Sequence, residues 1–188
     1  MIIVCDVDDT INNLMNVTIE LYNEKYGTDY DISSVTTFNL ENCFDEEVAK
    51  DMRAIFESTT DSIWKKVKPF KGSQEALEKL ILEGHQVYLA TNNCPATYGE
   101  KVAWIKRFYP FIDESKIICI KDKWMLRADV MIEDSWQNLL AKPYYHRILM
   151  DQPWNQSTKD EVYGIYRCSN WKDIVTVVNK INEEECAN

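Results

Sequence analysis

Histidine is scarce in this 188-residue chain, which contains only His85 and His146. Zinc sites in proteins rely largely on histidine and cysteine ligands, and the six cysteines include no Cys-x-x-Cys pair. A histidine-rich zinc site is therefore not expected. Several cysteines lie inside apolar runs, which favours reduced, buried thiols and a cytoplasmic location over a disulfide framework.

Long apolar runs and an excess of positive charge are also missing. No run approaches the roughly 20 residues that a membrane span needs, and the strand-like start has no basic region of the kind that opens a secretory signal. Lys and Arg total 21 against 31 Asp and Glu, a formal net charge of −10, whereas nucleic-acid binding needs basic surfaces. Membranes and nucleic-acid polymers are not expected partners. A small phosphorylated substrate is compatible with this charge, because a bound cation can reverse the local field.

Short apolar runs alternate with helical patterns along most of the chain. The helical pattern over 72–84 offers Ser73 as an N-cap, and two more patterns cover 100–110 and 170–181. Continuous apolar runs of strand length are typical of parallel strands buried on both faces. The alternation predicts an α/β fold of three α/β/α layers around a mostly parallel, Rossmann-like sheet. The six runs lie at 2–6, 86–91, 117–121, 129–134, 147–151 and 164–168.

Residues 12–68 interrupt this alternation because they carry helical signals only, at 12–27 and 45–58. A connection between a strand and the next element is usually only a few residues long. We therefore expect a helical cap subdomain over 12–68, inserted after the first strand into an α/β core made of 1–11 and 69–188.

Polar residues gather where the predicted strands end, and parallel α/β sheets bind their ligands at that edge. Crowded carboxylates raise one another's pKa and need a counter-ion. Mg²⁺ meets that need, because it takes one or two carboxylates and also accepts phosphate oxygens. The residues at the strand ends are Asp6, Asp8, Thr91, Asn92, Lys121, Lys123, Glu133 and Asp134.

Four short motifs carry these residues in a fixed order: "DVDDT" (6–10), "LATNN" (89–93), "KDK" (121–123) and "MIEDS" (131–135). This order resembles the four-part signature of the haloacid dehalogenase-like superfamily. Residues 99–135 are similar to the matching segment of 5′(3′)-deoxyribonucleotidases, and "DQPWNQ" (151–156) is similar to a run in their bacterial and phage relatives. The resemblance implies a Mg²⁺-dependent phosphatase acting on (deoxy)nucleoside monophosphates.

The acids of the first motif suggest a mechanism. Hydrolysis of a phosphate monoester is very slow without a catalyst, and a covalent intermediate divides it into two easier steps. Asp6 would attack phosphorus to give an aspartyl-phosphate, and Asp8 would act as general acid and then as general base. Asp6, the region of Asp8, and Asp134 would bind Mg²⁺.

Other site residues have alternatives. Thr91 and Asn92 would hydrogen-bond the phosphate oxygens, although Thr91 could instead cap the next helix. Lys123 would supply positive charge. Lys121 competes with it, and the resemblance favours Lys123. The resemblance also implies that Asp134 binds the metal directly, while Glu133 supports the metal ligands from behind without binding the metal.

Two positions depart from the nucleotidase pattern. Asp9 stands where these enzymes usually have glycine, and Glu133 where they have aspartate. The superfamily as a whole tolerates both residues, so we still expect activity. Asp9 is expected to serve the turn or the start of the next helix and not catalysis.

Aromatic residues of the predicted cap are candidates for holding a base, because base stacking contributes about 1–3 kcal/mol. Trp64 is the first choice, since it lies next to the return linker at 65–72, and Phe38, Phe44 and Phe56 follow. The alternative is that these rings form the core of the cap itself. Trp104 and Trp171 are expected to pack on the sheet.

Two other functions fit the same motifs. A sugar-phosphate phosphatase or a phosphomutase would use the same chemistry, and a non-catalytic metal- or phosphate-binding regulator would keep only the fold. The intact set of acids and Lys123 argues against the regulator. A homodimer is left open.

Overall fold

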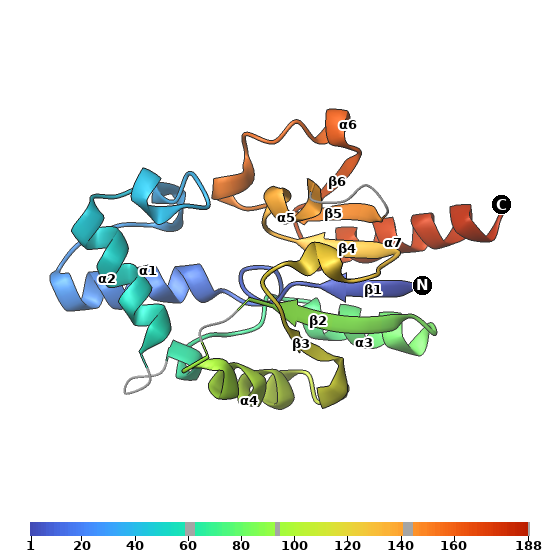
Figure 1. The fold of residues 1–188 in the computed structure, drawn as a ribbon, viewed down its shortest axis with the longest axis horizontal. Coiled ribbons are helices and arrows are strands. Elements are labelled where there is room, and N and C mark those ends of the chain that lie inside the picture. The colour runs from blue at the N-terminus through green and yellow to red at the C-terminus, as the bar shows by residue number, and fades with distance from the viewer. Residues whose placement is uncertain (59–62, 93–94, 141–144, 188) are drawn as a thin grey trace.

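The centre of the molecule is a six-stranded parallel sheet with strand order β3-β2-β1-β4-β5-β6 (Figure 1). The computed structural model describes residues 1–58, 63–92, 95–140 and 145–187. All six predicted strands are present, which confirms the expected α/β class. The strands are β1 (Ile2–Cys5), β2 (Gln86–Thr91), β3 (Ile117–Cys119), β4 (Val130–Glu133), β5 (His146–Met150) and β6 (Ile165–Cys168).

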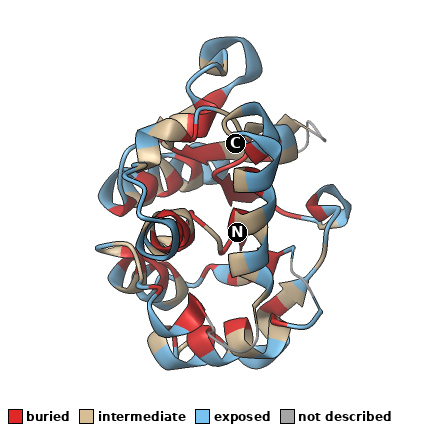
Figure 2. Ribbon diagram, turned by 90° about the vertical axis from the view of Figure 1, so that its left-hand side faces the viewer, coloured by how far each residue is buried: buried red, intermediate tan, exposed pale blue. Residues whose placement is uncertain are grey.

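Helices cover both faces of the sheet. Successive side chains of a strand point to opposite faces, and the apolar side chains on each face are buried under these helices. Ile3 and Cys5 of β1 belong to one apolar cluster, which also includes Trp104 and Trp171. Val4 of the same strand belongs to the cluster on the other face. Buried residues follow the strands and the inner sides of the helices (Figure 2). The helices of this core are α3 (Ser73–Leu82), α4 (Tyr98–Phe108), α5 (Trp136–Leu140), α6 (Asp160–Tyr163) and α7 (Trp171–Cys186), with 3-10 turns η4 (Glu114–Lys116), η5 (Lys123–Met125) and η6 (Pro153–Asn155).

The start of α3 differs from the prediction by one residue. Gly72 is the N-cap, with a φ of 83° that favours glycine, and Ser73 is the first helical residue. The Ser73 hydroxyl contacts the carbonyl oxygen of Phe70 and the hydroxyl of Tyr109, both at 2.7 Å. The serine therefore serves a buried polar contact instead of capping the helix.

The segment between β1 and α3, here called the helical insertion (12–68), lies mainly at one end of the molecule, drawn in blue to teal in Figure 1. Its centre forms an apolar cluster of its own around Ile19 and Met52. Its two ends pack into the main core through Leu14 and Trp64. Its elements are α1 (Leu14–Tyr26), η1 (Ile32–Ser34), η2 (Leu40–Asn42), α2 (Glu46–Glu57) and η3 (Ile63–Lys65).

The chain enters and leaves the helical insertion side by side. Asn12 and Pro69 form an isolated antiparallel bridge. The amide of Asn13 donates to the carbonyl of Lys68 at 3.2 Å, and the amide of Phe70 donates to the carbonyl of Ile11 at 2.9 Å. We call this antiparallel pair of segments the neck.

Two sequence expectations concern the environment of the chain. Among the described residues, no helix has both the length and the apolar character needed to cross a membrane. The five cysteines in the described ranges are all free, and Cys94 lies outside those ranges.

Candidate active site

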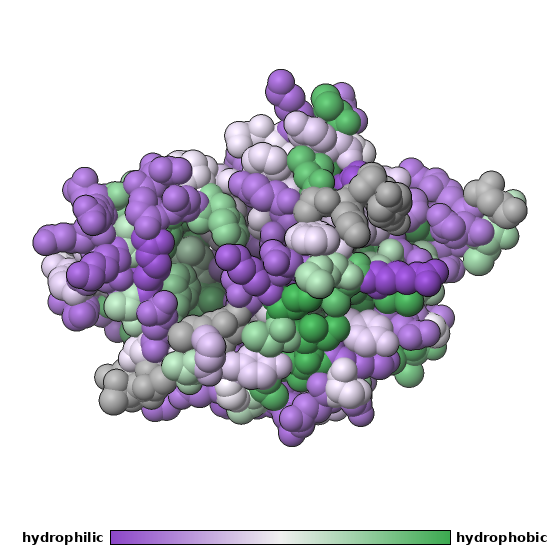
Figure 3. Space-filling model, viewed as in Figure 1, coloured by the Kyte–Doolittle hydropathy of each residue, from purple (hydrophilic) through white to green (hydrophobic). Residues whose placement is uncertain are grey.

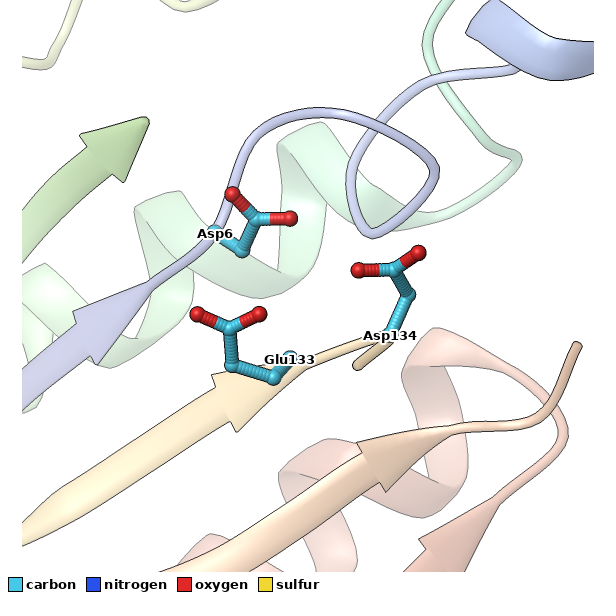
Figure 4. Close-up of side chains that lie close together, drawn as sticks. All are labelled: Asp6, Glu133 and Asp134. Atoms are coloured by element: carbon cyan, nitrogen blue, oxygen red, sulfur yellow. The ribbon is translucent and has the colours of Figure 1, made fainter. Parts of the chain in front are cut away.

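The first group of site residues lies where β1 and β4 end side by side. These strands are neighbours although β2 and β3 separate them in sequence, so the chain order reverses between them, and ligands bind at such points. Asp6 follows β1, Glu133 ends β4, and Asp134 comes next. Ligand atoms of these three buried side chains lie within 4.8 Å of one another, and the carboxylates point toward a shared space (Figure 4).

Lys123 lies within this group and is only 4% exposed. Its Nζ is 2.5 Å from Asp6 Oδ1 and 2.8 Å from Glu133 Oε1. Burial alone would lower the pKa of Lys123, but the two carboxylates outweigh burial and raise it. The lysine is therefore held in its charged form, and it neutralises only part of the negative charge around it.

The remaining negative charge is unfavourable without a cation. Burial raises the pKa of Asp134 well above its usual value, and the charges of Asp6 and Glu133 raise it further. Burial also raises the pKa of Glu133 to about 7, although Lys123 opposes that shift. Buried carboxylate oxygens are the donors that Mg²⁺ prefers, and the cluster has more carboxylates than Lys123 can balance. The residues present therefore fit a divalent cation.

A second group lies on the β2 side of the same edge. Lys101, on α4, is only 1% exposed, and its Nζ is 2.5 Å from Asp8 Oδ2 and 2.8 Å from Thr91 Oγ1. The ammonium group also lies 5.3 Å from the ring centre of Trp64. The Asp8 side chain is 26% exposed, so this acid faces both the lysine and the cavity.

The other predicted phosphate ligands divide between these groups. Thr91 is buried and its hydroxyl contacts Lys101, while Asn92 is exposed and lines the cavity. Lys121 is exposed and lines the cavity, whereas Lys123, the other lysine considered for this role, contacts the carboxylate of Asp6. Asn93 lies outside the described residues.

Asp9 has a different setting from the two acids before it. Its φ of 55° is left-handed, a conformation that glycine adopts without strain. Its carboxylate accepts the amide of Met15 at 2.8 Å, near the start of α1. Burial raises the pKa of Asp9 well above its usual value. The positive φ gives a physical reason why glycine suits this position in related enzymes.

A cavity of about 790 Å³ lies between the site and the helical insertion, and a hollow is visible there in Figure 3. Its apolar walls include Phe38, Phe56, Trp64 and Trp154. Phe44 is not one of its lining residues. The ring of Phe44 packs edge-on against Tyr30 in the cluster of the helical insertion, with ring centres 5.1 Å apart.

Sequence reasoning missed Lys101, although a signal for it was present. The lysine stands three residues before Trp104 and four before Ile105, on the face of the helix that packs inward. A lysine on a buried helical face needs a charged or polar partner, and here Asp8 provides it. Trp154, whose indole N–H donates to Asp134 Oδ2 at 2.9 Å, had no comparable signal, because this partner lies on another element.

Comparison with known proteins agrees with this geometry. The family described as 5′ nucleotidase, deoxy (Pyrimidine), cytosolic type C protein matches residues 1–182. A 5′(3′)-deoxyribonucleotidase from Bacillus subtilis is 24% identical over 179 residues, which cover 92% of this chain and 95% of that protein. A second, from Clostridium acetobutylicum, is 28% identical over 152 residues, covering 81% and 82%.

Solved structures share the fold. A haloacid dehalogenase-like hydrolase from Streptococcus pneumoniae aligns with a TM-score of 0.63 and 12% identity, covering 94% of this chain and 97% of its own. A hydrolase from Pseudomonas syringae aligns with a TM-score of 0.61 and 13% identity, covering 96% and 99%. At these identities the likeness concerns the fold.

Proposed function

The chain belongs to the family of 5′ nucleotidase, deoxy (Pyrimidine), cytosolic type C proteins, and we propose on that premise that it is a Mg²⁺-dependent 5′(3′)-deoxyribonucleotidase. It would hydrolyse the phosphomonoester of (deoxy)nucleoside monophosphates through an aspartyl-phosphate. The observation that carries this proposal is the buried group of Asp6, Lys123, Glu133 and Asp134, with Asp8 two residues beyond Asp6.

Asp6 acts as the nucleophile. One carboxylate oxygen attacks phosphorus, the bond from phosphorus to the ester oxygen breaks, and an aspartyl-phosphate forms. Lys123 holds Asp6 Oδ1 at 2.5 Å, and the hydroxyl of Thr10 donates to Oδ2 at 3.3 Å. These contacts fix the orientation of the carboxylate before the substrate arrives.

Asp8 moves the protons. In the first step it gives a proton to the departing alkoxide, and in the second it takes one from the water that attacks the aspartyl-phosphate. Water attack releases inorganic phosphate and restores the Asp6 carboxylate. Lys101 and Thr91 hold Asp8 at the edge of the cavity between these steps.

Asp6, the region of Asp8, and Asp134 would hold Mg²⁺. Glu133 would lie behind them, where its carboxylate contacts Lys123 and Asn138. The bound cation would offset the charge of the transferring phosphoryl group and shield the nucleophile. Thr91, Asn92 and Lys123 would bind the phosphoryl oxygens as negative charge develops on them.

The helical insertion would act as the cap that covers the substrate. The cavity volume of about 790 Å³ lies within the usual range of about 300–1,000 Å³ for ligand sites. Phe38, Phe56 and Trp64 line it from the insertion and would contact the base and sugar. The free thiols support a cytoplasmic location for such an enzyme. A homodimer is compatible with this function.

The test is phosphate release by the purified protein with Mg²⁺ on a panel of nucleoside and sugar monophosphates. We expect deoxynucleoside monophosphates to be preferred, and a stronger rate on sugar phosphates would overturn the substrate assignment. Asp6→Asn should abolish turnover and the phosphorylated protein that mass spectrometry detects after rapid quenching. Asp29→Asn, an exposed acid of the helical insertion, is the matched control and should retain both.

A further inference from the structure

The segment "DQPWNQ" has no role in the chemistry above, yet it reaches into the site. It follows β5 and contains η6, drawn in orange beside the blue helical insertion in Figure 1. The indole Nε1–H of Trp154 donates to Asp134 Oδ2 at 2.9 Å. Asn155 Nδ2 donates to the backbone carbonyls of Asp134 and Met150, both at 2.8 Å. The segment therefore holds both the side chain and the main chain of Asp134.

The indole contact determines how Asp134 presents itself to a cation. One carboxylate oxygen is engaged by the N–H donor, which leaves the other for the metal. Groups that hydrogen-bond a metal ligand in this way fix its orientation, and their loss typically weakens metal binding by about 10- to 100-fold. Trp154 is 5% exposed, so water does not readily replace its N–H donor.

The same indole ring belongs to the helical insertion. Trp154 is a member of the apolar cluster formed by Ile19, Val35, Leu40 and Met52, although it lies more than one hundred residues further along the chain than any of them. One edge of the ring contacts a candidate metal ligand, and its apolar body completes the core of the insertion. No other residue of that buried cluster lies outside the insertion in the described ranges.

The segment that carries Trp154 is itself fixed to the sheet. Arg167 on β6 donates from Nη1 to Asn155 Oδ1 at 2.6 Å and to Asp151 Oδ1 at 2.7 Å. Gln152 Nε2 donates to the backbone carbonyl of Asp9 at 2.7 Å. The segment is therefore held both by β6 and by the loop that follows β1.

We propose that Trp154 is a positioning residue that couples seating of the helical insertion to metal binding at Asp134. This inference rests on the proposed function, because it takes Asp134 as a metal ligand. Mg²⁺ orders Asp134, Asp134 holds the indole, and the indole ring holds the cluster of the insertion in place. By linkage, a seated insertion favours Mg²⁺ to the same degree.

The first experiment is calorimetric titration of Mg²⁺ into the full chain and into Trp154→Phe, which keeps an aromatic ring but loses the N–H donor. We expect the dissociation constant to rise about 10- to 100-fold. Trp104→Phe is the matched control, because it removes another buried indole N–H, which donates to the carbonyl of Val67 at 3.0 Å. Its Mg²⁺ affinity should equal that of the wild type.

The second experiment is amide hydrogen exchange with and without Mg²⁺. In the wild type, Mg²⁺ should slow exchange in α2, and in Trp154→Phe that slowing should be smaller. The indole N–H resonance of Trp154 should also shift during the Mg²⁺ titration of the wild type, which tests the contact even where the variant folds poorly.

The outcomes separate the two proposals. Equal Mg²⁺ affinity in the wild type and Trp154→Phe, or exchange in α2 that does not respond to Mg²⁺, overturns the coupling and leaves the proposed function standing. A wild type that binds no Mg²⁺ overturns the metal assignment in the proposed function, and the coupling with it.

Discussion

Two buried lysines divide the site into halves with different charge balance. On the β4 side, Lys123 faces two carboxylates directly and a third, Asp134, lies in the same cluster. On the β2 side, Lys101 faces the single carboxylate of Asp8. The first half keeps excess negative charge in a buried space. The second is close to neutral and opens to the cavity.

This difference separates two tasks of the proposed reaction. A buried excess of carboxylate raises pKa values and attracts a divalent cation, which suits metal binding and nucleophilic attack. The pair of Asp8 and Lys101 lies at the cavity edge, where the carboxyl group can reach a bound substrate, which suits acid–base work. If the halves have these separate tasks, substitutions in each half should affect stability and turnover differently.

Lys123→Met should have the largest effect, because it removes the lysine that contacts both Asp6 and Glu133. Breaking a buried pair by removing one partner costs about 3–5 kcal/mol of unfolding free energy, and kcat should fall by about 10²- to 10³-fold. Urea denaturation measures the change in unfolding free energy, and phosphate release measures the change in kcat. Lys121→Met, at an exposed neighbour, is the control. A variant at position 123 as stable as the control would contradict the excess-charge account.

Lys101→Met should act on proton transfer and affect stability less. We expect kcat on a nucleoside monophosphate to fall by about 10- to 100-fold, a part of the usual acid–base contribution. On p-nitrophenyl phosphate, whose leaving group needs little protonation, the fall should be smaller. Lys106→Met is the control, because Lys106 lies on the same helix as Lys101 but forms an exposed ion pair with Glu114 of η4. Equal losses on both substrates would count against a role in positioning Asp8.

Stability should depend on pH through the β4 side. Burial raises the pKa of Glu133 to about 7, whereas an unfolded glutamate titrates near 4.3. The folded protein then binds more protons than the unfolded one within this window, so the free energy of unfolding decreases as pH rises from about 4.5 to about 7. The pKa of Asp134 is also raised, so its titration likewise lowers the free energy of unfolding as pH rises. Thermal melts from pH 5 to 8 should show the decline without Mg²⁺ and a weaker one with Mg²⁺. Rising stability would contradict the assignment.

Substitutions at Asp9 should have the smallest effect, because this acid belongs to neither half. Asp9→Gly removes the strain of a positive φ, about 1–2 kcal/mol. It also loses the contact with the amide of Met15, worth about 0.5–1.5 kcal/mol. The net change in unfolding free energy should stay within about 1 kcal/mol. Asp9→Ala keeps the strain and loses the contact, so it should be the less stable variant in the same urea titration.

The sequence was sufficient to predict the sheet and the acids at its edge, because strand runs and strand ends are local patterns. Asp6, Glu133 and Asp134 meet since parallel strands end together, which topology alone requires. The partners of Asp8 and Asp134 were not predictable in the same way. Trp154 contacts Asp134 only because the segment after β5 folds back over the strand ends.

Aromatic residues of the helical insertion show the same limit. Phe44 lies directly before the helical pattern at 45–58 and Phe56 lies within it, yet only Phe56 of these two lines the cavity. Phe44 packs instead against Tyr30 within the insertion, a tertiary contact that no periodic pattern in the sequence records. The N-cap of α3 shows the limit on a smaller scale. It is Gly72 and not Ser73, whose hydroxyl makes a tertiary contact with Tyr109.

The neck gives the helical insertion two attachment points that lie side by side. Entry and exit meet at the bridge between Asn12 and Pro69, so replacing the insertion need not lengthen the path between β1 and α3. Leu14 and Trp64 pack into the main core, which sets the splice points inside the first turn of α1 and before η3. The ring of Trp154 completes the buried cluster of the insertion and its N–H donates to Asp134, so a graft from a relative would have to exchange the insertion together with the segment after β5.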